Sequence, residues 1–347
     1  MKPPLVFLLT LLGIVTSSLG ENVVVNTTSV SDKLQVGFYK LSCPNAEKIV
    51  EDVINKSSKQ NQGIIPGIIR LHFHDCYVTG CDASILLTPE RYNSLNAEMA
   101  HPANSISLRG MDALEAAKAD IEKQCPGIVS CADILAFAAR DVVVLAGNPR
   151  YEVPAGRRDS FSTDGSFAND LPKGNHSVDH LIKTFAERGL TTEDLIVLEG
   201  SHSIGQTRCL NTIADNSSMV GDEMLGAKTL VDRPFQQMVK QKFCPESQEE
   251  LFWNMTSPLV PANPNTSNWG ISYYDDIMKG KSLIPSDIAL AVDPSTKELV
   301  AHFASDSADW QKKFNEAMIK LGKINILTDK QGEIRKTCRW VNAVNTA

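Results

Sequence analysis

The sequence predicts a mostly α-helical fold. In several stretches apolar residues recur at the three- and four-residue spacing of helices, and the alternating pattern of strands is scarce. One segment, residues 131–146, is apolar on nearly every side, which predicts a helix buried in the middle of the molecule. A chain of 347 residues is long enough to bury a core and to form two lobes.

Four further stretches carry an apolar stripe at helical spacing. They lie at residues 46–54, 111–121, 178–185 and 310–321. A proline or glycine follows three of them, at Pro126, Gly189 and Gly322, as is typical of helix ends. These breaks support separate helices rather than one long one.

A further helix is predicted to begin near Thr191. Leu195, Leu198 and His202 then share one face, so His202 is expected at the inner end of an amphipathic helix. From the pattern alone, such a histidine is more often a core residue than a ligand. Residues 245–272 are rich in Pro, Asn, Ser and Thr and predict a long loop.

The first twenty residues have the features of a secretory signal peptide. Lys2 precedes an apolar run from Leu5 to Val15, and Ser18-Leu19-Gly20 places small residues at a cleavage site. No comparable apolar run follows, so we expect a secreted protein without a membrane span. We predict a signal peptide over residues 1–20, a flexible extension over 21–33 and one domain over 34–347.

The cysteine content agrees with secretion. Eight cysteines behind a leader predict four disulfides in an oxidising compartment, although spacing alone does not choose their pairing. Sequons for glycosylation occur at Asn26, Asn55, Asn175, Asn216, Asn254 and Asn265. The net charge of −7 argues against nucleic acid or an anionic membrane as the main partner.

The segment from Arg70 to Cys76 has the densest set of reactive side chains. At helical spacing Arg70, Phe73 and His74 fall on one face while His72 points elsewhere, which argues against a two-histidine metal site. An imidazole that takes a proton, beside a guanidinium that stabilises negative charge, suits cleavage of an O–O bond. A core helix with one buried histidine is the alternative interpretation.

The next segment places two carboxylates and a hydroxyl around a glycine turn. Asp75, Asp82 and Ser84 supply hard oxygen ligands in a tight loop that Cys76 and Cys81 can close, which suits Ca²⁺. A disulfide-stabilised turn with solvated acids is the alternative interpretation.

Several blocks of the sequence resemble the class III secretory plant peroxidases. They are RLHFHDCYVTGCDAS at 70–84, SCAD at 130–133, GRRDS at 156–160, GSHSIG at 200–205 with Cys209, and CRWVN at 338–342. Their order and spacing also match, from about residue 34 to the C-terminus. The resemblance implies a two-lobed, all-α haem peroxidase fold, with haem b between a distal and a proximal lobe.

The resemblance also implies roles for residues on the distal side. His74 is the base that moves the peroxide proton, and Arg70 stabilises charge on the leaving oxygen. Asn104 hydrogen-bonds the distal histidine and keeps it basic. Phe73 directs donors to the haem edge, where Pro172 lines the donor-binding mouth.

On the proximal side, the resemblance implies that His202 is the axial ligand of the iron. Asp287 accepts a hydrogen bond from its other ring nitrogen, which makes the imidazole more electron-donating. The implied reaction reduces H₂O₂ to water through a ferryl haem and porphyrin radical. Two donors, which we expect to be phenolic, then each lose one electron.

Disulfides and calcium ligands follow from the same resemblance. The implied pairs are Cys43–Cys125, Cys76–Cys81, Cys131–Cys338 and Cys209–Cys244. The implied distal calcium ligands are Asp75, Val78, Gly80, Asp82 and Ser84, with Glu98 reaching a bound water. At the proximal calcium site Ser203 can supply the hydroxyl, but no Asp or Glu lies between Leu251 and Tyr274. We therefore predict that the proximal calcium is absent or weak.

The sequence thus predicts an active, monomeric peroxidase of the extracellular space or cell wall. Such an enzyme is a donor:hydrogen-peroxide oxidoreductase whose partners are H₂O₂ and small donors. The alternative is a non-enzymatic, disulfide-rich secreted binding or signalling protein on the same scaffold. The incomplete proximal calcium site is the observation that supports this alternative.

Overall fold

The computed structural model describes residues 33–88, 96–209, 230–243, 256–258 and 269–342. Helices dominate these residues, and the predicted all-α fold is confirmed. The α-helices of the described residues are α1 (Ala46–Gln60), α2 (Ile64–Val78), α4 (Met111–Gln124), α5 (Cys131–Ala146), α6 (Val178–Ala186), α7 (Thr192–Glu199), α9 (Arg233–Lys242), α11 (Ile271–Met278), α12 (Pro285–Val292), α13 (Lys297–Ser305) and α14 (Ser307–Leu321).

Short elements connect these helices. The 3-10 helices of the described residues are η2 (Ser84–Leu86), η3 (Glu98–Ala100), η4 (Ser105–Ser107), η5 (Gly165–Asp170) and η6 (Gly200–Ser203). The strands β1 (Gln206–Arg208) and β2 (Thr256–Pro258) pair in antiparallel fashion, with Thr207 opposite Ser257.

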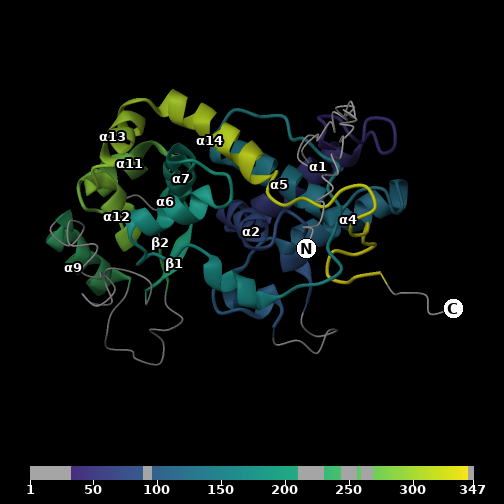
Figure 1. Ribbon diagram of the computed structural model, residues 1–347, viewed down its shortest axis with the longest axis horizontal. Coiled ribbons are helices and arrows are strands. Elements are labelled where there is room, and N and C mark those ends of the chain that lie inside the picture. Colours follow the sequence, from purple (N-terminus) through teal and green to yellow (C-terminus); the bar gives the residue numbers. More distant parts are fainter. Residues whose placement is uncertain (1–32, 89–95, 210–229, 244–255, 259–268, 343–347) are drawn as a thin grey trace, which may run out of the picture.

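The helices form two groups that lie side by side (Figure 1). In the first group, α1, α2 and α4 pack against α5. In the second, α11, α12 and α13 pack on one another, and α7 packs on α6 and α14. Because α14 also contacts α2, it joins the two groups, and the predicted two-lobed arrangement is present.

The helix α5 is central to the first group. Residues 131–143 are all buried, as the apolar sequence predicts. The Ser130 side chain accepts a hydrogen bond from the backbone N–H of Asp133 at the start of the helix. Gly147 follows the last turn at φ +114°, a conformation that favours glycine.

The buried carboxylate of Asp133 connects α5 to two distant segments. It accepts hydrogen bonds from Tyr39 Oη and from the backbone N–H of Gly156, each at 2.7 Å. It also forms an ion pair with Arg157 Nη1 at 2.7 Å, and both side chains are almost fully buried. A paired and hydrogen-bonded charge is the form in which a buried carboxylate is tolerated.

A second buried carboxylate, Asp159, lies at the N-terminus of α5. It accepts hydrogen bonds from the backbone N–H groups of Cys131 and Ala132 at 3.1 and 2.9 Å. Helix N-termini favour negative charge because their first N–H groups have no partner within the helix. Asp159 also accepts from the backbone of Arg335 at 2.9 Å, which fixes the C-terminal segment to this helix.

Three of the four expected disulfides join described residues. They are Cys43–Cys125, Cys76–Cys81 and Cys131–Cys338. Cys209 is also disulfide-bonded, and its expected partner Cys244 lies outside the described residues. Cys131–Cys338 closes a long stretch of chain, and such a closure restricts the unfolded state.

The prediction of a loop over residues 245–272 is wrong at two places. Thr256–Pro258 forms β2, and α11 already begins at Ile271. The strand forms by pairing with β1, which lies about fifty residues earlier in the chain. A three-residue sequence pattern could not predict this long-range pairing.

Some predictions fall on residues that the structure does not describe. The predicted signal peptide and all but the end of the extension lie in residues 1–32, and four sequons, Asn26, Asn216, Asn254 and Asn265, also lie outside the described ranges. Within those ranges, none of the helices combines the length and the apolarity that a bilayer crossing requires.

Candidate functional site

His74 is buried on α2, and its ring is held by one hydrogen bond. His74 Nδ1 lies 2.6 Å from Asn104 Oδ1. The Asn104 amide in turn donates from Nδ2 to the backbone oxygen of Glu98 at 2.7 Å, which fixes the orientation of the amide. Because an amide oxygen only accepts, Nδ1 carries the proton and Nε2 keeps a lone pair.

The charge state of His74 suits a base. Burial lowers the pKa of the imidazole well below 6.5, and the positive charge of Arg70 lowers it further, while the hydrogen bond to Asn104 opposes both. The imidazole is therefore neutral near pH 7 and able to accept a proton at Nε2.

Arg70 is hydrogen-bonded to the same loop that holds His74, the residues around Asn104. Its guanidinium donates to Ser107 Oγ at 2.9 Å and to the backbone oxygen of Ala103 at 2.7 Å, and these residues flank Asn104. Burial lowers the pKa of Arg70 to about 10, which still leaves the side chain positively charged. A fixed cation beside a neutral base can stabilise a negative oxygen.

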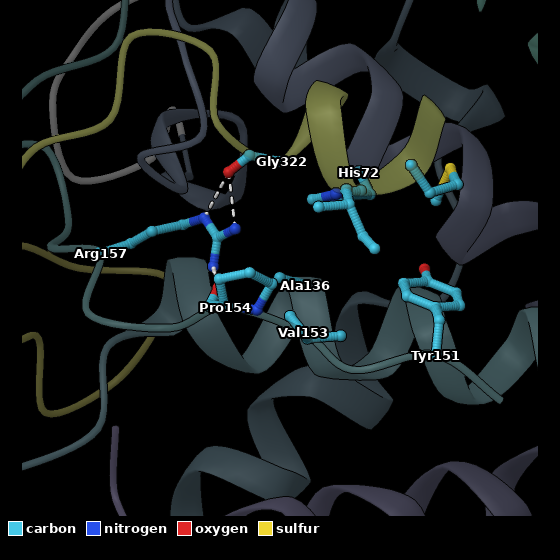
Figure 2. Close-up of a pocket in the computed structure, with 9 residues that line it drawn as sticks. His72, Ala136, Tyr151, Val153, Pro154, Arg157 and Gly322 are labelled. Atoms are coloured by element: carbon cyan, nitrogen blue, oxygen red, sulfur yellow. Dashed lines mark hydrogen bonds between the residues drawn. The ribbon is translucent and has the colours of Figure 1, made fainter. Parts of the chain in front are cut away.

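His72 lies away from this site, as its spacing predicts. It lines a separate cavity of about 10 Å³, room for about one water, with Tyr151, Arg157 and Gly322 (Figure 2). Burial and the charge of Arg157 lower the pKa of His72 to about 3. This histidine is thus a neutral core residue.

Aromatic rings surround Phe73, the third residue on the reactive face of α2. Its ring stacks on Tyr77 with centroids 5.0 Å apart and lies 6.1 Å from the ring of Phe185. Pro172 follows η5 and the buried Leu171, and it is partly exposed. Phe73 is therefore held by packing, while Pro172 is accessible from solvent.

The position of His202 differs from the prediction. The helix α7 ends at Glu199, and His202 lies in the 3-10 helix η6 rather than on a continuous α-helix. Ser203 Oγ donates to the backbone oxygen of Gly200 at 2.8 Å within this turn. A Cβ on Gly200 would lie 2.6 Å from Trp310 Nε1, so this close approach requires glycine.

Two carboxylates contact the ring of His202 through the same nitrogen. Nδ1 lies 3.1 Å from Asp287 Oδ1 and 2.8 Å from Glu199 Oε2. Ser282 Oγ donates to the other oxygen of Asp287 at 2.8 Å. Burial would lower the pKa of His202, but the two carboxylates outweigh it and hold the pKa well above 6.5.

The residues around His202 and Arg70 fit a haem. With Nδ1 engaged by carboxylates, Nε2 is the nitrogen that an iron could bind. Arg208, six residues after His202, has a buried Nη2 with no hydrogen-bond partner among the described residues. Its charge reaches Arg70 and helps to lower the pKa of that guanidinium, so two cations border one region. An anionic group such as a haem carboxylate would satisfy Arg208 Nη2.

The predicted calcium loop contains buried acids without partners. Asp75 Oδ2 accepts from the backbone of Ala83 at 3.1 Å, whereas Asp75 Oδ1 and both oxygens of Glu98 are buried without a hydrogen bond among the described residues. Burial, with the charge of Asp82, raises the pKa of Glu98 to about 8. Burial and both neighbouring acids raise the pKa of Asp75. Such a cluster fits a hard cation.

The rest of the calcium loop has a conformation fixed by close packing. Val78 is the last residue of α2, and Gly80 follows at φ +135°, where a Cβ would lie 2.5 Å from the backbone oxygen of Asn325. Ser84 Oγ lies 3.0 Å from Thr79 Oγ1. The loop is therefore pressed against the C-terminal part of the chain.

Comparisons with known proteins identify the family. The family model described as Peroxidase matches residues 50–306. Peroxidase 5 of Vitis vinifera is 38% identical over 312 residues, which cover 90% of this chain and 92% of the relative. Peroxidase 1 of Zea mays is 38% identical over 317 residues, 89% of this chain and 83% of the relative. Peroxidase 39 of Arabidopsis thaliana is 36% identical over 315 residues, which cover 89% of this chain and 93% of the relative. The chain belongs to the class III plant peroxidases.

This class III peroxidase is therefore a haem enzyme that uses H₂O₂ and donor substrates, in a family that binds haem and calcium. The non-enzymatic alternative is not favoured. The structure brings Arg70, His74 and Asn104 together, and it brings His202 to Asp287.

Two residues of the peroxidase site were missed by sequence reasoning. Glu199 lies three positions before His202, a spacing that places side chains together on a helix and could have indicated the contact. Arg208 offers no such signal, because its importance comes from burial and from the distant Arg70.

We predict that the start of α7, the helix that leads to His202, contributes pH-dependent stability. Thr191 and Asp194 form a reciprocal capping box, and Lys320 Nζ lies 2.8 Å from Asp194 Oδ1. Although burial opposes it, the contacts with Lys320 and Thr191 hold the pKa of Asp194 below its usual value. Such stabilisation exists above about pH 4 and is lost as pH falls through the folded-state pKa.

Asp194→Asn should lower the free energy of unfolding by about 1 kcal/mol at pH 7. The difference from the wild type should shrink below pH 4, as urea unfolding at both pH values can show. Asp275→Asn, which removes an exposed partner of Lys279, is the matched control. A loss that does not depend on pH would contradict the role of the carboxylate charge.

Proposed function

We propose that His74 and Arg70 activate H₂O₂, that His202 holds the iron of haem b, and that small phenols are the electron donors. The observation that carries this proposal is the contrast between the two histidines. His74 Nδ1 contacts a neutral amide oxygen, whereas His202 Nδ1 contacts carboxylates. The first environment maintains a neutral base, and the second makes the imidazole an electron-rich ligand.

Haem b supplies, when bound, the two electrons that the O–O bond takes up, and it recovers them one at a time from donors. His202 would hold it through Nε2. Arg208 would pair with one of its carboxylates, because the buried Nη2 otherwise lacks a partner among the described residues.

The proton moves through His74. Nε2 takes a proton from one oxygen of H₂O₂ and delivers it to the other oxygen, which leaves as water. The positive charge of Arg70 stabilises the negative charge on the leaving oxygen. Two donors then each lose one electron and one proton, so one H₂O₂ and two donors yield two waters and two donor radicals.

The aromatic surroundings of the site favour phenolic donors. Phe73 occupies the reactive face of α2 next to His74, and Phe167 on η5 is half-exposed, five residues before Pro172. Aromatic rings bind one another through stacked and edge contacts. Turnover of a panel of phenols and non-aromatic reductants with H₂O₂ tests this class. A preference for the non-aromatic reductants would overturn it.

We further propose one calcium ion, at the distal site. Asp75, Asp82 and Ser84 would bind it by side chain, Val78 and Gly80 by carbonyl, and Glu98 through a water. The buried oxygens without partners support this set. At the proximal site Ser203 Oγ already donates to Gly200 and accepts from the backbone of Gly270 at 2.9 Å, which supports a weak or absent calcium there.

We propose that the enzyme acts as a monomer in the extracellular space. The disulfides of the described residues are typical of proteins that fold in an oxidising compartment. Asn175 is exposed and Asn55 is partly exposed, so both sequons are accessible to modification.

His74→Leu should lower the rate of reaction with H₂O₂ by about 10²- to 10⁴-fold, because the base that moves the proton is lost. Stopped-flow absorbance of the haem-loaded protein measures the rate. His302→Gln, which replaces an exposed histidine bound to Asp309, should leave it unchanged. A wild-type rate in His74→Leu would remove His74 from the mechanism.

Metal analysis of the purified enzyme should find one calcium per chain. A chelator should lower its thermal midpoint, because the buried acids would then lack a cation. Glu98→Gln should weaken calcium binding, whereas the same change at the exposed Glu187 should have no effect. Two tightly held calcium ions would contradict the assignment of an incomplete proximal site.

A further inference from the structure

The proximal imidazole has two carboxylate partners from different elements. Asp287 comes from the first turn of α12, whereas Glu199 is the last residue of α7. Between Glu199 and His202 the chain continues as the 3-10 helix η6. Side chains three residues apart eclipse one another in a 3-10 helix, so this turn brings the carboxylate of Glu199 to the ring.

The contact of Glu199 has the features of a built site rather than of a surface ion pair. Its side chain is 11% exposed and that of Asp287 is 1% exposed. Two carboxylates so close together repel each other, and burial adds to the cost, unless both are compensated by a common donor. His202 Nδ1 contacts both: it is hydrogen-bonded to Asp287 Oδ1 at 3.1 Å, and Glu199 Oε2 lies 2.8 Å from it as an ion-pair partner.

The three groups are of kinds that can also bind a metal ion directly. Here both carboxylates approach the same ring nitrogen, since Asp287 is hydrogen-bonded to Nδ1 and Glu199 lies 2.8 Å from it. One N–H shared by both acceptors would form a three-centre hydrogen bond. This arrangement leaves the remaining ring nitrogen for the iron.

We propose that Glu199 is a second proximal carboxylate, a positioning residue that accepts the Nδ1 proton of His202 together with Asp287. Glu199 makes the imidazole a stronger electron donor to the iron than Asp287 alone does, and it partly replaces Asp287 when that residue is lost. This inference rests on the proposed role of His202 as iron ligand.

The test compares haem-loaded wild type, Glu199→Gln, Asp287→Asn and the double variant. Two quantities are measured: the FeIII/FeII midpoint potential by spectroelectrochemistry, and the iron–histidine stretching frequency of the ferrous form by resonance Raman. Each single variant should raise the potential and lower the stretching frequency, because a weaker acceptor at Nδ1 makes the ligand less electron-donating. Asp287→Asn should have a larger effect when Glu199 is already replaced.

Glu193→Gln is the matched control. It removes the same charge from the same helix, but its partner is Lys313 at 3.1 Å. It should leave both quantities at their wild-type values. Glu199→Asp, which withdraws the carboxylate by one methylene, serves as a second variant should Glu199→Gln fail to fold, and it should shift both quantities in the same direction.

Two results would overturn the inference, and they are distinguishable. If the wild type shows no iron–histidine band, His202 is not the axial ligand, and the proposed site fails together with the inference. If the band is present and Asp287→Asn shifts it, while the Glu199 variants behave like Glu193→Gln, then only the inference fails.

Discussion

The site depends on how the protein binds one nitrogen of each histidine. At His74 the partner of Nδ1 is the amide of Asn104, which fixes the ring without adding charge. At His202 the partners are Glu199 and Asp287, which add negative charge. Two identical side chains thereby acquire opposite properties, which suit one to the proposed role of neutral base and the other to the proposed role of electron-rich ligand. In both cases Nε2 is left for chemistry.

The residues next to His74 and its partner Asn104 also form the buried acidic loop. The residue after His74 is Asp75, whose carboxylate begins the proposed calcium loop, and Cys76 closes that loop with Cys81. Glu98 accepts from Asn104 through its backbone, while its side chain lies among the buried acids of the loop. A cation in the loop would thus stabilise the same segments that orient the base. Under the proposed assignment, calcium binding and the position of His74 would be physically linked.

Sequence was sufficient where local pattern decides structure. The apolar surface of residues 131–146 predicted α5, and helical spacing separated His74 from His72, which indeed lines another cavity. Sequence was insufficient where tertiary contacts decide. The 3-10 turn that brings His202 to Glu199 begins at Gly200, where a Cβ would clash with the distant Trp310. The β1–β2 pairing and the buried Nη2 of Arg208 likewise depend on distant partners.

The buried acids give the proposed ligands a physical role. In the calcium loop, buried acids lack hydrogen bonds among the described residues, and the pKa of Glu98 rises to about 8 because its charged form is poorly solvated. On the proximal side two carboxylates face a single ring nitrogen. Both places bring carboxylates together in the protein interior. Calcium and a haem iron are cations, so under the proposed assignment their binding would offset the cost of burying these carboxylates, and the folded state would gain stability with each ligand that it holds.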